Sequence, residues 1–561
     1  MNNWFTQHIL PQLQYFNSET LWSWFTYNPM EPMLFNTARF LAMFMVFYSV
    51  YIALKNTFYP RLIYVICFSL FFYYLSSGAF FILIVLSSVF DYFITKWMYY
   101  SKSIKTQKLL VTISVIVNLG LLGYFKYMNF FIDSYNTLSN SYLEFQKIAL
   151  PVGISFFTFQ SISYVVEIYR KEIQPTKSYI DYLFFISFFP QLVAGPIVRA
   201  KDFLSQIYSD LNITKDDMNQ GMLLIIGGII KKVVISDYIS SNFVDRVYDL
   251  PNAYTPFENL MASYGYAIQI YCDFSGYSDM AIGIALLLGF KLPTNFKTPY
   301  QSKSITEFWR RWHISLSTWL RDFLYISVGG NRNGSFAGFL FPSLFFVALL
   351  GWGIYMISTS IIPLIIALTS TLVFCLSFLL SKNKERTMFT DVNLMTTMLL
   401  GGLWHGASLR YIVWGALHGG ALAVHKLVLE YFPDSDSNKK SITKTLWNIV
   451  AVVLTFHFVT FCWIFFRAKD FDTALTVIKN IGNLTFDLNQ WYTIYQGYTN
   501  VFLLMLFGFV WHYIPDNWMQ KVQLVFKSAT LMGKALILAF VYWLVYATAQ
   551  EGPQPFIYFQ F

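Results

Sequence analysis

Apolar runs of about 20 residues recur along the whole chain, and they limit the possible folds more than any other feature. A run of this length can cross a bilayer as one helix. The 561 residues are 56% hydrophobic and only 12% charged, whereas soluble domains carry about 25% charged residues. The sequence therefore predicts an all-α polytopic integral membrane protein with roughly eleven to fourteen membrane segments, some re-entrant or interfacial. The segments are expected at about 37–54, 62–75, 79–95, 109–125, 149–168, 179–197, 220–238, 260–288, 336–356, 361–380, 392–430 (a broken pair), 446–466, 498–514 and 531–549.

Lys and Arg residues gather in loops that alternate crossings would bring to one side of the membrane. Lys55 and Arg61 flank the first loop, Lys102 lies in the next, and Arg170 and Lys171 follow a later segment. Cytoplasmic loops are enriched in Lys and Arg, so this side is predicted to be cytoplasmic. The net charge of +9 is spread over such loops, which favours contact with the bilayer over binding of nucleic acid.

Two units follow from this orientation. Residues 1–36 contain Trp4, Phe16, Trp22 and Trp24 among polar residues, and are expected to form an amphipathic extracytoplasmic or interfacial segment. Residues 37–561 are expected to form a single transmembrane domain. The stretches 434–444 and 467–500 are expected to be loops within it.

The clearest candidate for chemistry is His405, in the stretch GGLWHG at 401–406. Burying a titratable ring in hydrocarbon costs free energy, so an intramembrane histidine indicates a functional site. Gly402 and Gly406 remove side-chain bulk beside it and allow close approach of a helix or a substrate. The alternative is a histidine that packs between helices and bonds a neighbouring carbonyl.

A second unusual stretch is SKSITEFWRRWHISLSTWLRDFLYISVGGNRNG at 302–334. On one continuous helix, Arg310, His313, Ser317 and Arg321 would share a face. So many charges among tryptophans indicate an interfacial or re-entrant helix shielded from lipid. The alternative is an amphipathic helix on the cytoplasmic surface whose charges are solvated. In either case Arg310, Arg311 and Asp322 are expected to be paired, Arg311 with Glu307 among the options.

Two carboxylates, Asp273 and Asp279, lie within an apolar run. Buried carboxylates need partners, and the arginines near residue 310 are the expected ones. An ion pair is favoured over acid–base chemistry. His405 and His418 are not accompanied by a metal-binding motif, so no metal is expected.

Several of these stretches together resemble the membrane-bound O-acyltransferase (MBOAT) family, and more narrowly its bacterial alginate O-acetyltransferase branch. The resemblance is dense over residues 150 to about 420. It is carried by LPVGISFFTFQSISYVVEIYR (150–170), FFPQLVAGPIVR (188–199), DFSGYSDMAIGIALLLGFKLPTNFKTPY (273–300), FWRRWHISLSTWLRDFLYISVGGNR (308–332) and GGLWHG (401–406). The D-alanyltransferases of teichoic acid share both histidine motifs but are shorter chains.

The resemblance implies a fold with a central tunnel and an enzyme of the O-acyltransferase class. His405 would be the catalytic general base acting on an acceptor hydroxyl, and His313 would orient the donor or polarise its carbonyl. The acyl donor would be a cytoplasmic thioester, acetyl-CoA or an acyl carrier protein, with no permanently bound cofactor. Other residues expected to line the tunnel or to support the histidines are Trp404, Gly402, Gly406, Arg310, Arg311, Ser317, Arg321, Asp322, Asp273 and Asp279.

The acceptor implied by the resemblance is an extracytoplasmic polysaccharide or another envelope polymer, reached from the bacterial cytoplasmic (inner) membrane. A periplasmic protein that receives the acyl group or presents the polymer is a further expected partner, docking on the outer side that includes residues 1–36. Two alternatives stay open at this point. One is transfer of an aminoacyl or other acyl group to a lipid or wall polymer. The other is a proton-coupled transporter, for which an inverted repeat would be typical.

Overall fold

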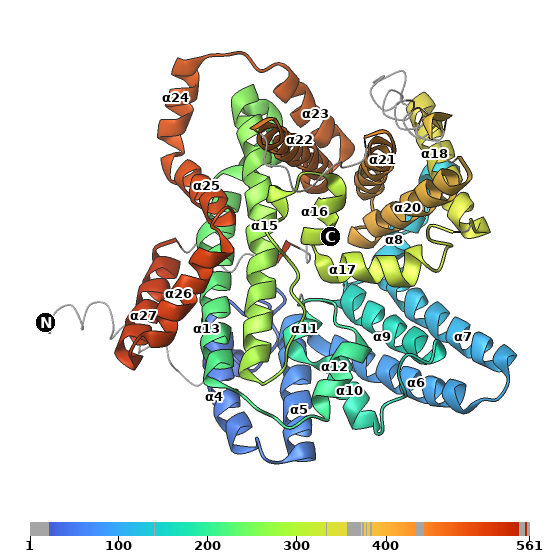
Figure 1. Cartoon of the computed structure of the whole chain (residues 1–561), viewed down its shortest axis with the longest axis vertical. Coiled ribbons are helices and arrows are strands. Elements are labelled where there is room, and N and C mark those ends of the chain that lie inside the picture. The colour runs from blue at the N-terminus through green and yellow to red at the C-terminus, as the bar shows by residue number, and fades with distance from the viewer. Residues whose placement is uncertain are drawn as a thin grey trace, which may run out of the picture.

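The computed structural model describes residues 22–139, 141–193, 195–332, 334–355, 384–432, 442–548 and 556–557, with residues 368, 372, 375, 376 and 379–381 between them. Every regular element within these ranges is a helix (Figure 1). The predicted all-α class is therefore confirmed over the part of the chain that the structure describes. The expected segment 361–380 and residues 1–21 lie outside it, apart from the single residues named above.

The first third of the chain forms the lower and right-hand parts of the molecule in Figure 1. Its helices are α4 (Ala38–Ala53), α5 (Phe58–Ser77), α6 (Phe81–Tyr100), α7 (Ile104–Leu122), α8 (Met128–Ser139), α9 (Ile154–Tyr169), α10 (Tyr179–Ser187), α11 (Phe189–Leu192) and α12 (Ala200–Ile207).

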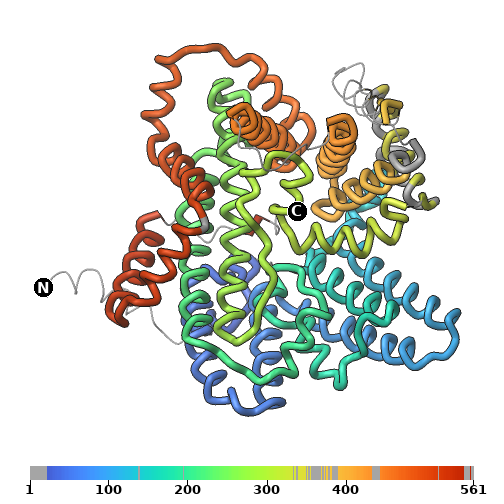
Figure 2. The backbone as a smooth tube through the Cα atoms, in the orientation of Figure 1, coloured from blue at the N-terminus to red at the C-terminus, as the bar shows by residue number. Residues whose placement is uncertain are grey.

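The middle of the chain contains α13 (Lys215–Ile229), α14 (Asp245–Asp249), α15 (Pro256–Leu287), α16 (Ile305–Arg311), α17 (Ile314–Trp319), α18 (Phe336–Tyr355), α20 (Lys384–His405) and α21 (Leu409–Tyr431). The C-terminal part contains α22 (Ile442–Arg467), α23 (Phe471–Gly482), α24 (Leu488–Gly497), α25 (Thr499–His512), α26 (Asp516–Ser528) and α27 (Leu531–Thr548). Helices α23 and α24 form an arch at one end of the tube trace (Figure 2). The expected loop at 467–500 is therefore wrong: Asp470 and Asp487 cap the first turns of two short helices instead.

Helix α15 stands at the centre of the molecule (Figure 1). It runs for 32 residues without a break, about 48 Å at 1.5 Å per residue. Thr255 and Glu258 form a reciprocal capping box at its start, and Pro256 occupies the first turn, where a missing N–H costs nothing. The segment expected at 260–288 is thus part of one long helix.

Helices α13 and α15 approach each other through pairs of glycines. A side chain on Gly276 would come within 2.7 Å of the Gly228 carbonyl oxygen, and one on Gly221 within 2.8 Å of the Gly283 carbonyl oxygen. Small residues let helix backbones meet closely where lipid supplies no hydrophobic driving force. This contact fixes α13 against the central helix.

In the part of the chain that the structure describes, four segments are π-helical: η2 (Gly123–Tyr127), η3 (Ile230–Asp237), η4 (Ser240–Val244) and η7 (Leu320–Tyr325). π-helical segments are rare in proteins, and those that occur often lie at functional sites. Three of them carry residues that matter below, namely Lys126, the pair Lys231–Lys232, and Asp322.

Five helical stretches within the described residues are long and apolar enough to cross a membrane. The bent pair α24 and α25, which meet at 91°, would make a sixth. The polytopic membrane character predicted from composition is thus confirmed. The number of membrane segments expected from the sequence is larger because it also includes segments shorter than a full span. The five stretches are Phe58–Tyr100, Ile104–Asn136, Leu409–Tyr431, Ile442–Arg467 and Leu531–Thr548.

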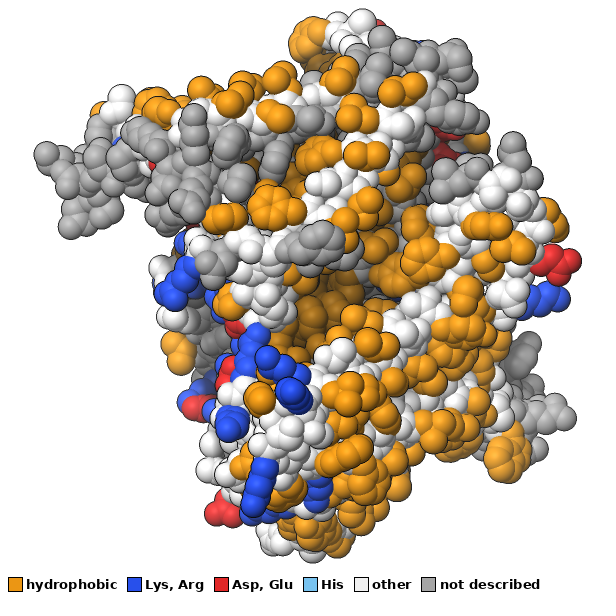
Figure 3. Space-filling model, turned by 90° about the vertical axis from the view of Figure 1, so that its right-hand side faces the viewer, with side chains coloured by type: hydrophobic (Ala, Val, Ile, Leu, Met, Phe, Trp, Pro, Cys, Tyr) orange, Lys and Arg blue, Asp and Glu red, His pale blue; other side chains and the backbone are white. Residues whose placement is uncertain are grey.

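The basic loops lie together at one end of the first helices. Lys96 Nζ lies 3.4 Å from the Lys177 carbonyl oxygen, which joins the end of α6 to the loop after α9. At the opposite end, the Met33 amide donates to the Leu75 carbonyl (3.1 Å) and the Val152 amide to Ser77 Oγ (2.9 Å). Figure 3 shows a broad hydrophobic face with Lys and Arg side chains gathered at its lower left. The geometry agrees with the shared side predicted for these loops.

Candidate active site

His405 is the last residue of α20, at the turn into α21. The two helices pack tightly there because glycines face backbone. A side chain on Gly402 would overlap the Tyr411 carbonyl oxygen, and one on Gly415 would overlap the Met398 carbonyl oxygen. A side chain on Gly406 would overlap the Tyr411 ring. The glycines of the GGLWHG stretch therefore set where the helical hairpin closes, and His405 lies at that point.

The His405 ring is 3% exposed and lies inside an aromatic cage. Its centroid lies 4.9 Å from that of Trp414, 5.0 Å from Trp404 and 5.2 Å from Phe466. These aromatic rings surround the imidazole with a low-dielectric environment. Bulk water is excluded there, so electrostatic interactions with a reacting group are stronger.

His313 reaches the same region from the stretch 302–334. It has a left-handed backbone (φ 41°) and separates α16 from α17. The side chain is fully buried, its ring 4.5 Å from Phe274 and 6.1 Å from Trp404 between centroids. Trp404 thus contacts both histidines, although they are far apart in the sequence.

The break at His313 corrects the expectation of one continuous helix. Arg310, His313, Ser317 and Arg321 do not share a face, because the chain turns sharply at His313 and becomes π-helical from Leu320. Both helices of this stretch are far shorter than a membrane span, α16 having 7 residues and α17 having 6.

The charged residues of this stretch lie away from the histidine rings. Arg311 pairs with Glu307 at 2.7 Å, as expected. Asp322 accepts hydrogen bonds from Arg199 and Arg321. Burial opposes the charge of Asp322, yet these hydrogen bonds outweigh it and hold the pKa of its carboxyl below the usual value.

Ser317 and Arg310 are the other two predicted site residues of this stretch, and the Ser317 amide donates to the His313 carbonyl (3.0 Å). The Ser317 hydroxyl donates to the Trp312 carbonyl. Arg310 makes no ion pair within the ranges that the structure describes, so the prediction that it would be paired is wrong.

Asp273 and Asp279 have partners other than those expected. Lys232 Nζ lies 2.6 Å from Asp273 Oδ1 and 2.7 Å from Asp237 Oδ1, and Lys231 Nζ lies 2.8 Å from Asp279 Oδ2. The prediction of arginines near residue 310 is wrong, because the π-helical turn η3 turns two successive lysines toward α15. The result is a buried structural network, and the preference for ion pairs over acid–base chemistry agrees with it.

Asn295 was not predicted as a site residue, yet it fixes the local geometry at His313. Asn295 Oδ1 lies 3.2 Å from His313 Nδ1 and accepts hydrogen bonds from the Ser315 amide (3.2 Å) and hydroxyl (2.8 Å). The Asn295 carbonyl accepts from the Ile314 amide. The sequence signal that could have pointed to it is a polar amide residue in a short connecting segment, since such a residue needs hydrogen-bond partners when it is buried.

Lys126 and Tyr127 also contact this region and were not predicted as site residues from the sequence. Lys126 Nζ donates to the carbonyls of Trp404 (2.6 Å) and His405 (3.1 Å), and the Tyr127 hydroxyl donates to the carbonyl of Leu403 (2.7 Å). A helix end leaves its last carbonyls without partners in the helix. Here the π-helical turn η2 supplies the donors, so it holds the end of α20 that carries His405.

No three His, Cys, Asp or Glu side chains gather as a metal site would within the described ranges. The arrangement that the structure does contain is two buried histidines around one tryptophan, inside a bundle of membrane helices. Fold and site together define an integral membrane protein that encloses a pair of titratable side chains, His313 and His405, among its helices.

Comparison with known proteins adds the family. Residues 104–374 match the membrane-bound O-acyltransferase family, a range that contains His313 and ends before His405. The chain is 35% identical over 474 residues to the "Probable alginate O-acetylase AlgI" of Pseudomonas putida, covering 80% of this chain and 84% of the relative. It is 34% identical over 483 residues to the peptidoglycan O-acetyltransferase of Helicobacter pylori, covering 81% and 80%. The teichoic acid D-alanyltransferase of Bacillus subtilis is 27% identical over 329 residues, covering 57% and 69%.

The chain therefore belongs to the membrane-bound O-acyltransferase family, and it is an O-acyltransferase. The resemblance predicted from the histidine motifs is confirmed.

Proposed function

We propose that this O-acyltransferase moves an acetyl group from a cytoplasmic thioester, acetyl-CoA or an acyl carrier protein, to a hydroxyl of an extracytoplasmic polysaccharide or envelope polymer. The observation that carries the proposal is the pair of buried histidines whose rings both contact the ring of Trp404. The similarity to an alginate O-acetylase from Pseudomonas and a peptidoglycan O-acetyltransferase from Helicobacter supports acetyl as the group and a polymer as the acceptor. The bacterial inner membrane is the proposed location.

In the proposed reaction His405 takes the proton of the acceptor hydroxyl. The hydroxyl oxygen then attacks the thioester carbonyl carbon, the carbon–sulfur bond breaks, and the thiolate leaves with the proton that His405 returns. His313, held against Asn295, polarises or orients the donor carbonyl. Transfer is direct, with no acyl-enzyme. Trp404 lies against both histidines, and Gly402 and Gly406 let α20 and α21 close beside His405.

A second candidate is transfer of an aminoacyl group to a wall polymer. The observation in its favour is the match to two teichoic acid D-alanyltransferases at 27% and 25% identity. Both matches cover less of this chain than the matches to O-acetylating relatives, namely 57% and 56% of it. Acetyl transfer is therefore the better supported of the two.

A separate extracytoplasmic protein is proposed to receive the acyl group or to present the polymer on the outer side. The described part of the N-terminal segment is tied to the bundle there. Arg39 Nε donates to the Trp24 carbonyl (2.8 Å), and Trp22 is 72% exposed. An exposed aromatic on an anchored segment suits a protein contact at the bilayer surface.

The first prediction tests the catalytic assignment. Replacing His405 with Ala should lower acyl transfer about 10²- to 10⁴-fold, because a positioned general base contributes that much. The readout is base-labile acetate on isolated envelope polymers, together with transfer from labelled acetyl-CoA in membrane vesicles. His457→Ala is the matched control, since His457 is exposed on α22, where its ring bonds the Val453 carbonyl and the Tyr264 hydroxyl of α15.

Detergent-solubilised His405→Ala protein should elute as a single monodisperse species like the parent chain. Undiminished acetylation by this variant would overturn the role of His405. Transfer of labelled alanine in place of acetate would select the second candidate.

A further inference from the structure

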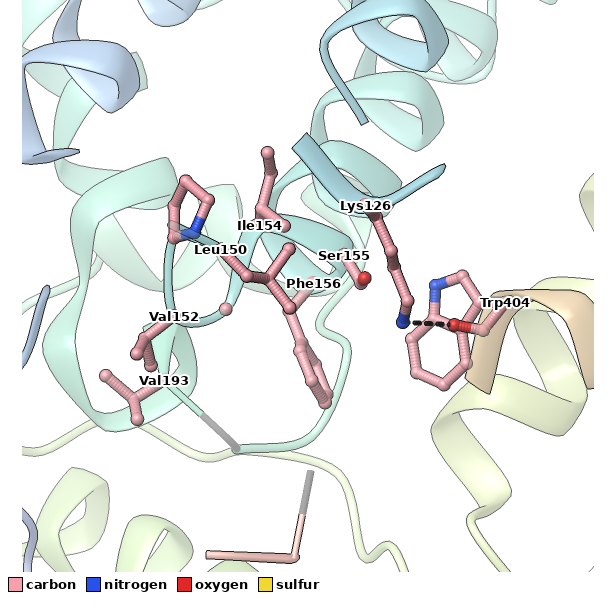
Figure 4. Close-up of a pocket in the computed structure, with 10 residues that line it drawn as sticks. Lys126, Leu150, Val152, Ile154, Ser155, Phe156, Val193 and Trp404 are labelled. Atoms are coloured by element: carbon pink, nitrogen blue, oxygen red, sulfur yellow. Dashed lines mark hydrogen bonds between the residues drawn. The ribbon is translucent and has the colours of Figure 1, made fainter. Parts of the chain in front are cut away.

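A small pocket lies beside the end of α20, on the side of Trp404 that Lys126 approaches (Figure 4). Its walls come from the segment Leu150–Phe156, from Val193, and from Lys126 and Trp404. His405 does not line it. The pocket is thus a neighbour of the proposed reaction centre and not the centre itself.

The first feature of this pocket is an ammonium group without a counter-ion. Lys126 Nζ is bonded to two carbonyl oxygens, and no carboxylate pairs with it within the described ranges. An ammonium has three donors, so two carbonyls leave one unused. A cation in such a setting favours a negatively charged oxygen as its next contact.

The second feature is the start of α9, a 16-residue helix that begins at the pocket wall. Its N-cap is Gly153, which has φ 73° and supplies no side-chain cap. A side chain there would overlap the Leu192 carbonyl oxygen, so the position needs glycine. The first amide groups of a helix carry partial positive charge and bind anions.

The third feature is Ser155 in the first turn of α9. Its side chain is 9% exposed, and no hydrogen-bond partner of its hydroxyl is recorded among the described residues. Figure 4 shows that hydroxyl directed to the side of the pocket from which Lys126 enters. The hydroxyl opens onto the pocket that Ser155 lines, so it is available to donate a hydrogen bond to a ligand oxygen there.

We infer that Lys126, Ser155 and the N-terminus of α9 form a binding subsite for an anionic group on the acceptor, a carboxylate or a phosphate, next to the reacting hydroxyl. The pocket holds about 50 Å³, against about 300–1,000 Å³ for sites that take a whole small molecule. It therefore takes one group and leaves the rest of the acceptor outside. This inference rests on the proposed function, since it assumes an acceptor at His405.

The chain offers variants that separate anion binding from support of His405. Ser155→Ala removes a pocket hydroxyl and leaves the bonds to α20 intact. Tyr127→Phe removes the bond to the Leu403 carbonyl and leaves the pocket intact. Lys126→Met removes the charge, and Lys126→Arg keeps it.

Binding is measured in the His405→Ala background, so that the result does not depend on turnover. The probes are a uronic acid oligosaccharide, its carboxyl-reduced neutral counterpart and a glycerol phosphate oligomer, titrated calorimetrically into purified protein in detergent. We expect the parent chain and Tyr127→Phe to prefer an anionic probe over the neutral one by at least about tenfold, the scale of one charge-assisted hydrogen bond. Ser155→Ala and Lys126→Met should lose most of that preference, and Lys126→Arg should keep part of it.

A preference for the uronic acid probe identifies a carboxylate, and one for the glycerol phosphate probe identifies a phosphate. Equal binding of all three probes by the parent chain would overturn the inference, as would an unchanged preference in both Ser155→Ala and Lys126→Met. If Lys126→Met does not fold, Ser155→Ala decides alone. Failure of the proposed function would look different, because His405→Ala would then leave transfer unchanged whatever the probes show.

Discussion

The glycines around His405 decide at the level of single atoms where α20 and α21 can meet. Gly402 and Gly415 each face a backbone carbonyl of the other helix, at a distance that leaves no room for Cβ. The sequence predicted close approach at Gly402 and Gly406, and the structure agrees. It did not predict the partners, because Tyr411 and Met398 carry no motif.

The prediction at this scale concerns Gly402. Gly402→Ala should destabilise the protein by about 1–3 kcal/mol, the usual cost of overpacking, and should lower activity because the hairpin cannot close beneath His405. Thermal unfolding in detergent and acetyl transfer are the two measurements. Gly420→Ala in α21 is the control, because no atom lies within 4 Å of its added Cβ; an equal loss of stability in both variants would contradict the argument.

The residues that sequence reasoning found and those it missed differ in a physical way. His405, His313 and Trp404 were found because titratable or aromatic residues in apolar motifs are unusual. Lys126 and Asn295 were missed because their roles depend on contacts with segments distant in the chain. The left-handed turn at His313 could not be read either, since neither glycine nor proline marks it.

At the scale of elements, the π-helical turn η3 and the central helix α15 are joined by buried charges. Lys232 is 1% exposed and bridges Asp237 and Asp273. The sequence predicted that these carboxylates would be paired, yet it named the wrong cations. A regular α-helix over 220–238 was the natural expectation, and the π turn changes which side chains face α15.

We expect Lys232→Met to destabilise the protein by about 3–5 kcal/mol, because two carboxylates would stay buried without their cation. The triple variant Lys232→Met/Asp237→Asn/Asp273→Asn should recover part of that loss. Lys527→Met is the control: Lys527 is 53% exposed in its pair with Asp216, and exposed pairs contribute only about 0–1 kcal/mol. The free energy of unfolding in mixed micelles is the quantity to compare, and a Lys232→Met loss no larger than the control's would refute the network's role.

At the scale of the whole molecule, composition alone predicted the all-helical membrane class, because about 20 apolar residues per segment leave few other folds. The number of helices that cross the membrane completely was harder to predict from the sequence than the fold class. The apolar run expected at 179–197, for example, forms two short helices, α10 and α11. Their apolar residues face protein in the bundle, which hydropathy does not distinguish from lipid.

The orientation is the remaining prediction at this scale. Cysteine introduced at Lys102, in the basic loop after α6, should react with a membrane-impermeant maleimide only in inside-out vesicles. Cysteine introduced at Glu31, near the contact of Met33 with Leu75, should react only in intact cells or right-side-out vesicles. Both positions are exposed. The reverse labelling pattern would invert the proposed direction of acyl transfer.

The four π-helical turns have a consequence for how this protein could evolve or be engineered. A π turn gives up the ordinary hydrogen-bond register of an α-helix, so each one is a local loss of stability kept for placement. Turn η2 places Lys126 at the end of α20 and η3 places Lys231 and Lys232 on α15. Selection for thermal resistance alone would favour straightened helices at these points, and the gain in stability would come with displaced lysines. Heat-stable variants that keep their activity should therefore carry their stabilising changes elsewhere.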